Sequence, residues 1–227
     1  TRGIPAHASL PMLGESAIDK GARAALALSE IGGTRARVPE ELKEVVARSG
    51  EFYVDMARKR GIPEERARRL AEVVGAYTVN VGKIEGGTKI NVVPEFCRLE
   101  VDIRIPPGGS SREAGELVEA ALERAGLRGM EARVIARSEP NYTPPGEDIC
   151  KLLLESIERV TGVRGELLCI TGFTDARLFR ARGIPAVVYG PGDLGMAHSC
   201  DEYVDAGEVV EASRIVALAV ASYLIRQ

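Results

Sequence analysis

The alternation of apolar and charged positions is most regular between residues 97 and 105. Every second residue there is apolar, and the residues between them are arginine, glutamate or aspartate. This pattern predicts a half-buried strand of an antiparallel sheet, with one apolar and one charged face. A shorter alternation over residues 77–81 predicts a second strand, and the sequence Glu-Gly-Gly-Thr at 85–88 predicts a turn.

Apolar residues recur at helical spacing in other segments of the first 140 residues. These stripes lie within residues 16–31, 39–56, 63–74 and 114–125, and two further strands are expected over residues 1–5 and 132–135. If the helices of 39–74 are set aside, the order is strand, helix, strand, strand, helix, strand, which matches the ferredoxin-like plan. We therefore expect an α+β ferredoxin-like domain over residues 1–140, with a helical insertion at 39–74.

After the proline-rich segment 139–146, helical stripes alternate with short apolar runs, which is typical of α/β architecture. Helices are expected over residues 152–160, from 175 and from 205, and buried strands over 167–170 and 186–189. Asp205, with Glu208 three residues later, predicts a capping box for the last helix. Two short strands do not form a stable sheet alone. We therefore expect the two strands of residues 141–227 to pair with strands from outside the chain.

Composition places the chain among ordinary globular proteins, with 45% hydrophobic and 28% charged residues. The 30 basic and 33 acidic residues are spread along the 227 positions, so no basic patch favours nucleic acid. The longest uncharged apolar run, residues 215–225, is too short to cross a bilayer, and no signal peptide opens the chain. Four widely spaced cysteines without a C-x-x-C pair fit reduced thiols. We therefore expect a cytoplasmic protein with a small-molecule or peptide partner, and neither a nucleic acid nor a membrane.

Candidate chemistry is concentrated in residues 190–202, Gly-Pro-Gly-Asp-Leu-Gly-Met-Ala-His-Ser-Cys-Asp-Glu, directly after the apolar run 186–189. This places His198 at the end of a predicted strand, where the sites of α/β folds usually lie. Three glycines match the G-x-G-x-x-G dinucleotide fingerprint, but no helix is predicted to open there. A nucleophile made of Cys200 and His198 lacks a third, orienting group. The imidazole of His198 suits zinc, although a catalytic zinc needs three protein ligands.

Four motifs, in this order, resemble a known family of enzymes. They are Gly3-Ile-Pro-Ala-His-Ala-Ser9, Gly86-Gly-Thr-Lys-Ile-Asn-Val-Val-Pro94 with Val101-Asp-Ile-Arg104, Gly172-Phe-Thr-Asp-Ala-Arg177, and the loop 190–202. Together they are similar to the dinuclear-zinc amidohydrolases and exopeptidases, which include acetylornithine deacetylase, succinyl-diaminopimelate desuccinylase, aminoacylase and carboxypeptidase G. The resemblance implies that residues 1–140 form the lid domain, through which the family dimerises. It also implies that residues 141–227 form the C-terminal α/β part of the catalytic domain.

The resemblance implies roles for individual residues as well. His198 matches a metal ligand, a histidine that binds the second of two zinc ions, for which cobalt can substitute. His7 matches the catalytic lid histidine that, in the family's dimers, enters the active site of the other subunit and hydrogen-bonds the tetrahedral oxyanion. Positions that hold polar groups of the substrate are matched by Asn91, Arg104, Thr174 and Arg177. For Arg104 the alternative is a solvated charge on the polar face of its strand.

The family's earlier catalytic half carries a His-x-Asp pair, a Glu-Glu pair and a further acidic ligand, and nothing in residues 1–227 matches that half. Because the chain also begins with Thr1 rather than methionine, we interpret it as a fragment that lacks most metal ligands and is inactive alone. The parent protein is expected to be a homodimeric, zinc-dependent hydrolase of an amide bond in small N-acyl amino acids or peptides. The alternative is a non-catalytic dimerisation or binding module with idle histidines.

Overall fold

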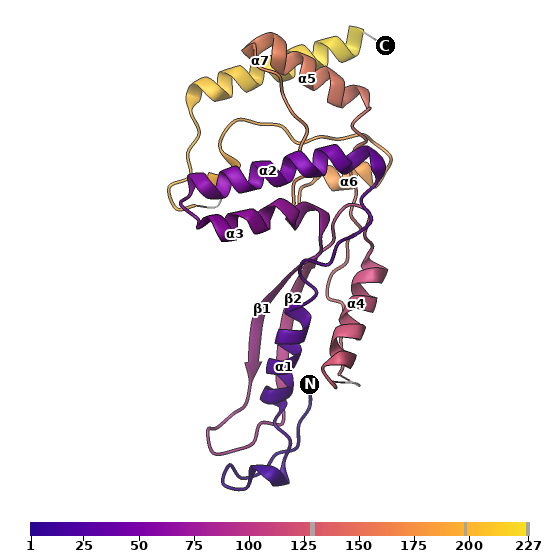
Figure 1. Cartoon of the computed structure of the whole chain (residues 1–227). Coiled ribbons are helices and arrows are strands. Elements are labelled where there is room, and N and C mark those ends of the chain that lie inside the picture. Colours follow the sequence, from indigo (N-terminus) through magenta and orange to yellow (C-terminus); the bar gives the residue numbers. More distant parts are fainter. Residues whose placement is uncertain (128–129, 198, 226–227) are drawn as a thin grey trace. The chain divides into compact units, whose positions relative to one another are not determined.

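A computed structural model describes residues 1–127, 130–197 and 199–225 (Figure 1). The chain forms two compact units. Unit 1 consists of Thr1–Val38 and Gly75–Pro140, and unit 2 consists of Pro39–Val74 and Asn141–Gln227. The border between residues 140 and 141 lies inside the predicted proline-rich crossing. The helical insertion at 39–74, which was expected in the first domain, belongs instead to unit 2.

The sheet of unit 1 is an antiparallel pair of β1 (Thr78–Gly86) and β2 (Cys97–Arg104), with the first residue of β1 opposite the last residue of β2. The alternation predicted for residues 97–105 is confirmed, because the apolar side chains at positions 99, 101, 103 and 105 pack against the buried core. Strand β1 is longer than predicted and includes the first two residues of the expected turn. Residues 87–96 then connect the two strands, starting at Gly87, whose φ of +73° suits glycine.

Two helices of unit 1, α1 (Ala17–Ser29) and α4 (Ser111–Arg124), lie against the apolar face of the sheet (Figure 1). Both agree with the predicted helical stripes. Each begins at a capping serine, because the hydroxyl of Ser16 accepts the N–H of Asp19 at 3.1 Å. In the same way the hydroxyl of Ser110 accepts the N–H three residues later at 3.2 Å. Such caps satisfy backbone donors that the helix itself leaves unpaired.

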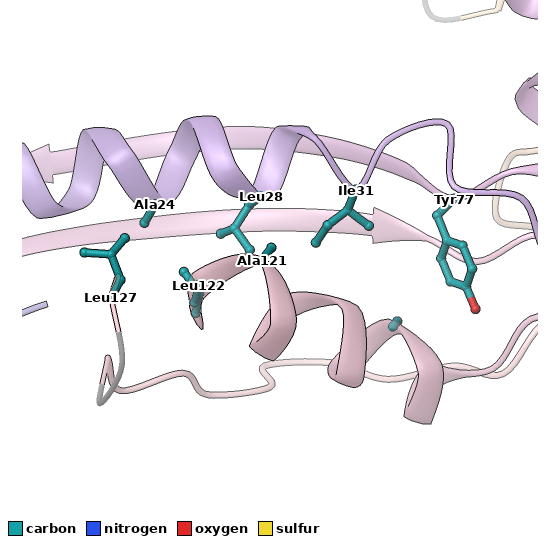
Figure 2. Packing of buried hydrophobic residues seen from close by; sticks show 8 residues of the cluster. Ala24, Leu28, Ile31, Tyr77, Ala121, Leu122 and Leu127 are labelled. Carbon is teal, nitrogen blue, oxygen red and sulfur yellow. The ribbon is translucent and has the colours of Figure 1, made fainter. Parts of the chain in front are cut away.

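The hydrophobic core of unit 1 lies between these helices and the sheet (Figure 2). It consists of Ala24, Leu28, Ile31, Tyr77, Ala114, Ala121, Leu122 and Leu127. The hydroxyl of Tyr77 donates to Glu113 Oε2 at 3.0 Å and accepts the N–H of Ser110 at 3.3 Å. Burial raises the pKa of the Tyr77 phenol, so the group stays protonated and keeps its donor. The tyrosine therefore ties the start of α4 to the sheet.

Two of the four strands expected for a ferredoxin-like sheet are not formed in the described residues. The first residues of the chain contact neighbouring segments through isolated bridges, including Arg2 to Phe96 and His7 to Val92. Residues 132–135 form no strand, and the apolar side chains at 134 and 135 are 65% and 76% exposed. A strand persists only where a neighbour pairs with its backbone groups. The described part of unit 1 is therefore α/β with a two-stranded sheet, and the four-stranded plan stays a prediction.

Unit 2 consists mainly of helices in its described part. The helices are α2 (Lys43–Lys59), α3 (Glu64–Arg69), α5 (Asp148–Thr161), α6 (Ala176–Arg180) and α7 (Ala206–Ile225). Short 3₁₀ turns are η2 (Glu40–Leu42), η3 (Leu70–Gly75) and η4 (Leu194–Met196), and η1 (Pro11–Leu13) lies in unit 1. Helix α5 packs against α7, and α2 against α3 (Figure 1). Within the described ranges, none of the helices combines the length and apolar character that a membrane crossing requires.

The helices predicted for unit 2 are confirmed, but its two predicted strands are not. Residues 167–170 and 186–189 lie outside any strand or bridge of the described structure. Apolar side chains in both runs remain exposed, such as Leu168 at 38% and Val188 at 52%. Their sequence has the apolar character of buried strands, but backbone pairing requires neighbouring strands that the described residues do not supply.

The helical insertion belongs to unit 2 because side chains of α2 bond the segment around residue 170. The buried hydroxyl of Ser49 accepts the N–H of Cys169 at 2.8 Å, and the hydroxyl of Tyr53 accepts the N–H of Thr171 at 3.3 Å. The backbone of α2 also approaches η3 closely, since a Cβ on Gly50 would lie 2.3 Å from a backbone oxygen. These contacts join segments far apart in sequence, so local periodicity does not reveal them.

A cluster of charged side chains surrounds Glu64 at the start of α3. Glu64 accepts hydrogen bonds from Arg58 at 2.8 and 2.9 Å and from Arg68 at 2.8 Å. These hydrogen bonds, that with Arg58 foremost, lower the pKa of Glu64 to about 2. Because the folded value is depressed, the stabilisation is complete above the ordinary pKa near 4.5 and is lost as pH falls toward 2.

We expect an NMR titration of the Glu64 side-chain carboxyl carbon to give a midpoint near 2. In the variant Arg58→Ala the midpoint should rise toward the ordinary value, because the strongest partner is gone. Lys59→Ala, which removes an adjacent charge outside this cluster, is the matched control. A wild-type midpoint near 4.5 would contradict the prediction.

Candidate functional site

The structure brings together two of the predicted site residues, His7 and Asn91, although they are far apart in sequence. His7 pairs with Val92 in an antiparallel bridge. The N–H of Ala8 donates to the carbonyl of Asn91 at 3.1 Å, and the N–H of Val93 donates to that of Ala6 at 2.8 Å. The backbone of both segments is therefore held in one register, and both residues lie on the exposed surface of unit 1.

The imidazole of His7 is oriented by one neighbour. Its Nδ1 lies 2.7 Å from the hydroxyl of Ser9 and accepts the N–H of the same residue at 3.2 Å. The N–H of Leu10 donates to the His7 carbonyl at 2.9 Å and closes a tight turn around these contacts. Among the described residues, Nε2 of His7 has no hydrogen-bonding partner. The ring therefore offers this nitrogen to a ligand.

Arg104 lies at the end of β2 that is remote from His7. Its guanidinium donates to Asp102 Oδ2 at 2.8 Å, and both side chains are about half exposed. Strand β2 has 8 residues and is therefore roughly 26 Å long, at about 3.3 Å per residue. The segment of His7 adjoins the opposite end of this strand, because Cys97 donates its N–H to the carbonyl of Thr1. The structure therefore does not bring Arg104 and His7 of one chain together.

Thr174 and Arg177 lie together at the start of α6 in unit 2, where the Arg177 N–H donates to the Thr174 carbonyl at 3.2 Å. The guanidinium of Arg177 stacks on Phe173, with Cζ 4.6 Å from the ring centroid. Its Nε is buried and has no hydrogen-bonding partner in the described structure. A buried donor without a partner is costly, which marks the Arg177 guanidinium as a candidate for binding an anionic group.

Arg180 is a residue of this region that the sequence reasoning missed. It is partly buried, and it donates to Asn141 Oδ1 at 2.8 Å and to the Ala186 carbonyl at 3.2 Å. Burial lowers the pKa of its guanidinium. Asn141 in turn donates to the Arg177 carbonyl at 3.0 Å, so Arg180 supports the turn that presents Arg177. Its position three residues after Arg177 on one helical face was the available signal.

The glycine-rich loop after residue 190 is fixed by carboxylates. The N–H of Gly192, whose φ is +96°, donates to Glu208 Oε2 at 2.9 Å, and Asp193 Oδ1 accepts the N–H of Gly195 at 2.7 Å. The predicted capping box is therefore half formed: Asp205 caps α7 at 2.7 Å through the N–H of residue 207, but Glu208 bonds the loop. The third glycine, Gly195, lies within the 3₁₀ turn η4 rather than at the start of an α-helix, which does not fit the dinucleotide fingerprint.

A second missed residue, Arg60 of the insertion, lies against this loop. A Cβ on Gly195 would come within 3.0 and 3.1 Å of the Arg60 guanidinium nitrogens and within 3.0 Å of Asp193 Oδ1. The Arg60 guanidinium therefore packs closely on Gly195, and a larger residue there would have to displace the ends of both side chains. His198, the predicted metal ligand three residues further on, lies outside the described residues.

A metal centre is not complete in the described part of the chain. Residues 1–127, 130–197 and 199–225 contain no group of three or more histidine, cysteine, aspartate or glutamate side chains arranged to hold a metal ion. The four cysteines are free, and burial raises the pKa of Cys97, Cys150 and Cys169, which keeps them as thiols. The described residues therefore need further ligands to hold a zinc ion.

A model of the peptidase dimerisation domain of the M20 family matches residues 1–130. The chain belongs to this family. The acetylornithine deacetylase of Myxococcus xanthus is 32% identical over 151 residues, which cover 64% of this chain and 38% of that enzyme. The succinyl-diaminopimelate desuccinylase of Corynebacterium glutamicum is 28% identical over 138 residues, covering 61% and 36%. The family resemblance drawn from the four motifs is thereby confirmed.

The fold is also found in solved structures. An M20 family metallo-carboxypeptidase of Sulfolobus solfataricus matches 99% of this chain with a TM-score of 0.74, at 20% identity. The match covers 56% of that protein, and the curated relatives are covered for less than half of their length. The 227 residues therefore correspond to part of the length of these proteins.

Proposed function

We propose that this chain forms part of a metal-dependent hydrolase that cleaves an amide bond in small N-acyl amino acids or peptides. The names of the M20 relatives, a deacetylase and a desuccinylase, support this reaction class. The observation that carries the proposal is the exposed imidazole of His7, held beside Asn91 with its Nε2 open to a ligand. A donor fixed in this way suits the oxyanion that forms when an amide carbonyl is attacked.

The substrate's carboxylate is proposed to bind Arg177, with Thr174 beside it. The planar guanidinium fork suits bidentate binding of a carboxylate, and the Nε of Arg177 has no hydrogen-bonding partner in the described structure. Asn91 and Arg104 are proposed to hold further polar groups of the substrate. Ion pairing with Asp102 is the competing role for Arg104.

We further propose that the active form is a homodimer through unit 1, the part that the dimerisation-domain model matches. Within one chain, His7 and Arg104 lie at opposite ends of β2. A site that uses both residues is therefore built from two copies, with His7 entering the site of its partner.

The proposed cofactor is zinc, two ions per complete site with cobalt as a substitute, and His198 is the proposed ligand from this chain. Bound metal would polarise the scissile carbonyl and activate water. Because the described residues do not form a complete metal centre, the remaining ligands are proposed to come from outside them.

The test is hydrolysis of N-acetyl and N-succinyl amino acids by the natural polypeptide that carries these residues. We expect activity that is lost on treatment with a chelator and restored by Zn²⁺ or Co²⁺. Hydrolysis that is indifferent to chelation would contradict the proposal. A polypeptide that dimerises but hydrolyses none of these substrates would favour the alternative, a non-catalytic dimerisation module.

A further inference from the structure

The contacts of His7 determine which of its ring nitrogens carries the proton. The backbone N–H of Ser9 points at Nδ1 from 3.2 Å, and the Ser9 hydroxyl lies 2.7 Å from the same atom. A backbone N–H can only donate, so Nδ1 must act as the acceptor and is unprotonated. In the other tautomer, the proton on Nδ1 would face the amide proton of Ser9.

A neutral imidazole carries one N–H, which in this geometry is on Nε2. We propose that Ser9 is a positioning residue that holds neutral His7 in its Nε2–H tautomer and aims that N–H at the bound ligand. The inference rests on the proposed function in one respect: the oxyanion that would receive the Nε2–H forms only if the protein is a hydrolase. The tautomer itself is independent of any activity.

Ser9 controls the ring because no other residue in the described part of the chain hydrogen-bonds the His7 imidazole. The His7 side chain is exposed, so packing does not fix its rotation. The backbone, in contrast, is fixed by the bridge to Val92 and by the turn in which Leu10 donates to the His7 carbonyl. With the backbone held, two donors from one residue suffice to select the ring orientation. An oxyanion donor acts best when it needs no reorganisation during the reaction.

The hydroxyl and the backbone N–H of Ser9 can be separated by substitution. Ser9→Ala keeps the N–H and removes the hydroxyl, whereas Ser9→Thr keeps both donors. The hydroxyl bonds the already unprotonated Nδ1 as a second donor, because a proton is not available on that atom. Ser9→Ala should therefore weaken the hydrogen bonding at Nδ1 without abolishing the tautomer.

The test is nitrogen NMR of the full 227-residue chain labelled at histidine, without a polyhistidine tag and at a pH where titration shows the ring to be neutral. The chain has only two histidines, so a His198→Gln variant assigns the His7 signals directly. We expect Nε2 in the protonated range and Nδ1 in the unprotonated range, with the Nε2–H form favoured about tenfold, as the loss of the backbone hydrogen bond in the other tautomer would give. A predominance of the Nδ1–H form, or a nearly equal mixture, would overturn the proposal.

The variants then test the hydroxyl. In Ser9→Ala the Nδ1 resonance should move further toward that of a free, unbonded ring nitrogen, and in Ser9→Thr it should stay at the wild-type position. Ser29→Ala removes another exposed hydroxyl of unit 1 and should change nothing at His7. An unchanged Nδ1 resonance in a folded Ser9→Ala protein would contradict the proposed hydrogen bond from the Ser9 hydroxyl to Nδ1. The NMR signals report on the tautomer and do not depend on hydrolysis. A protein without hydrolase activity can still show the expected signals, so the two proposals can be tested independently.

Discussion

Replacement of His7 by alanine is expected to lower kcat by about 100- to 1000-fold, the usual loss when one oxyanion donor is removed. KM should change little, because the donor meets a charge that develops only in the transition state. The exposed ring contributes little to the fold, so the variant should remain folded. The measurement is steady-state kinetics of the natural polypeptide with an N-acyl amino acid, with Ser29→Ala as the control. An unchanged kcat would rule out the oxyanion role.

The same residue tests whether the active site is shared between subunits. We expect the single variants His7→Ala and His198→Ala to be nearly inactive, and their co-expressed mixture to recover activity. If His7 serves the partner's site, each mixed dimer has one intact site, made of His198 from one subunit and His7 from the other. Random assembly would then restore about a quarter of wild-type activity. If His7 serves its own subunit, no dimer has an intact site and the mixture stays inactive.

The secondary structure of unit 1 shows which features can be read from local sequence. The strand at residues 97–105 and the helix after Ser110 depend on periodicity and on a capping side chain, both of which lie within a short stretch. Even the error at β1 is local. A Gly-Gly pair predicts a turn, but Gly86 still pairs with Cys97 and the turn begins one residue later.

The strands that do not form show the limit of that reasoning. Residues 132–135, 167–170 and 186–189 have suitable apolar runs, but a strand is a property of a pair of segments. The insertion was misplaced for a related reason. Its assignment to unit 2 depends on hydrogen bonds from Ser49 and Tyr53 to the segment near residue 170, which no periodicity encodes.

The candidate site was predictable only in part. The motifs suggested His7 and Asn91, but their adjacency comes from a backbone register that joins distant segments. Of the residues that support others, Ser9 lies in the first motif without a role assigned to it, and Arg60 and Arg180 lie outside the motifs. Their roles come from contacts with one ring nitrogen, one glycine and one asparagine, which only the three-dimensional structure places.

Replacement of Arg177 by alanine is expected to lower kcat/KM by about 100-fold for substrates that carry a free carboxylate. Removing one partner of a buried, charged hydrogen-bonded pair costs about 2–5 kcal/mol, and the effect should lie mainly in KM because the carboxylate does not react. Arg177→Lys should restore little, since an ammonium lacks the planar fork and stacks less well on Phe173. Arg182→Ala, which removes an exposed guanidinium just after α6, is the matched control.

Two further measurements separate substrate binding by Arg177 from a structural role. Added guanidinium should partly restore the activity of Arg177→Ala by occupying the space beside Phe173, and should do nothing for the wild type. Substrates whose carboxylate is replaced by an amide should lose the difference between wild type and variant. If Arg177→Ala slows both kinds of substrate equally, the arginine acts on the fold of the turn instead. The substrate's carboxylate would then have to bind another basic residue, and Arg104, at the end of β2, would be the next to test.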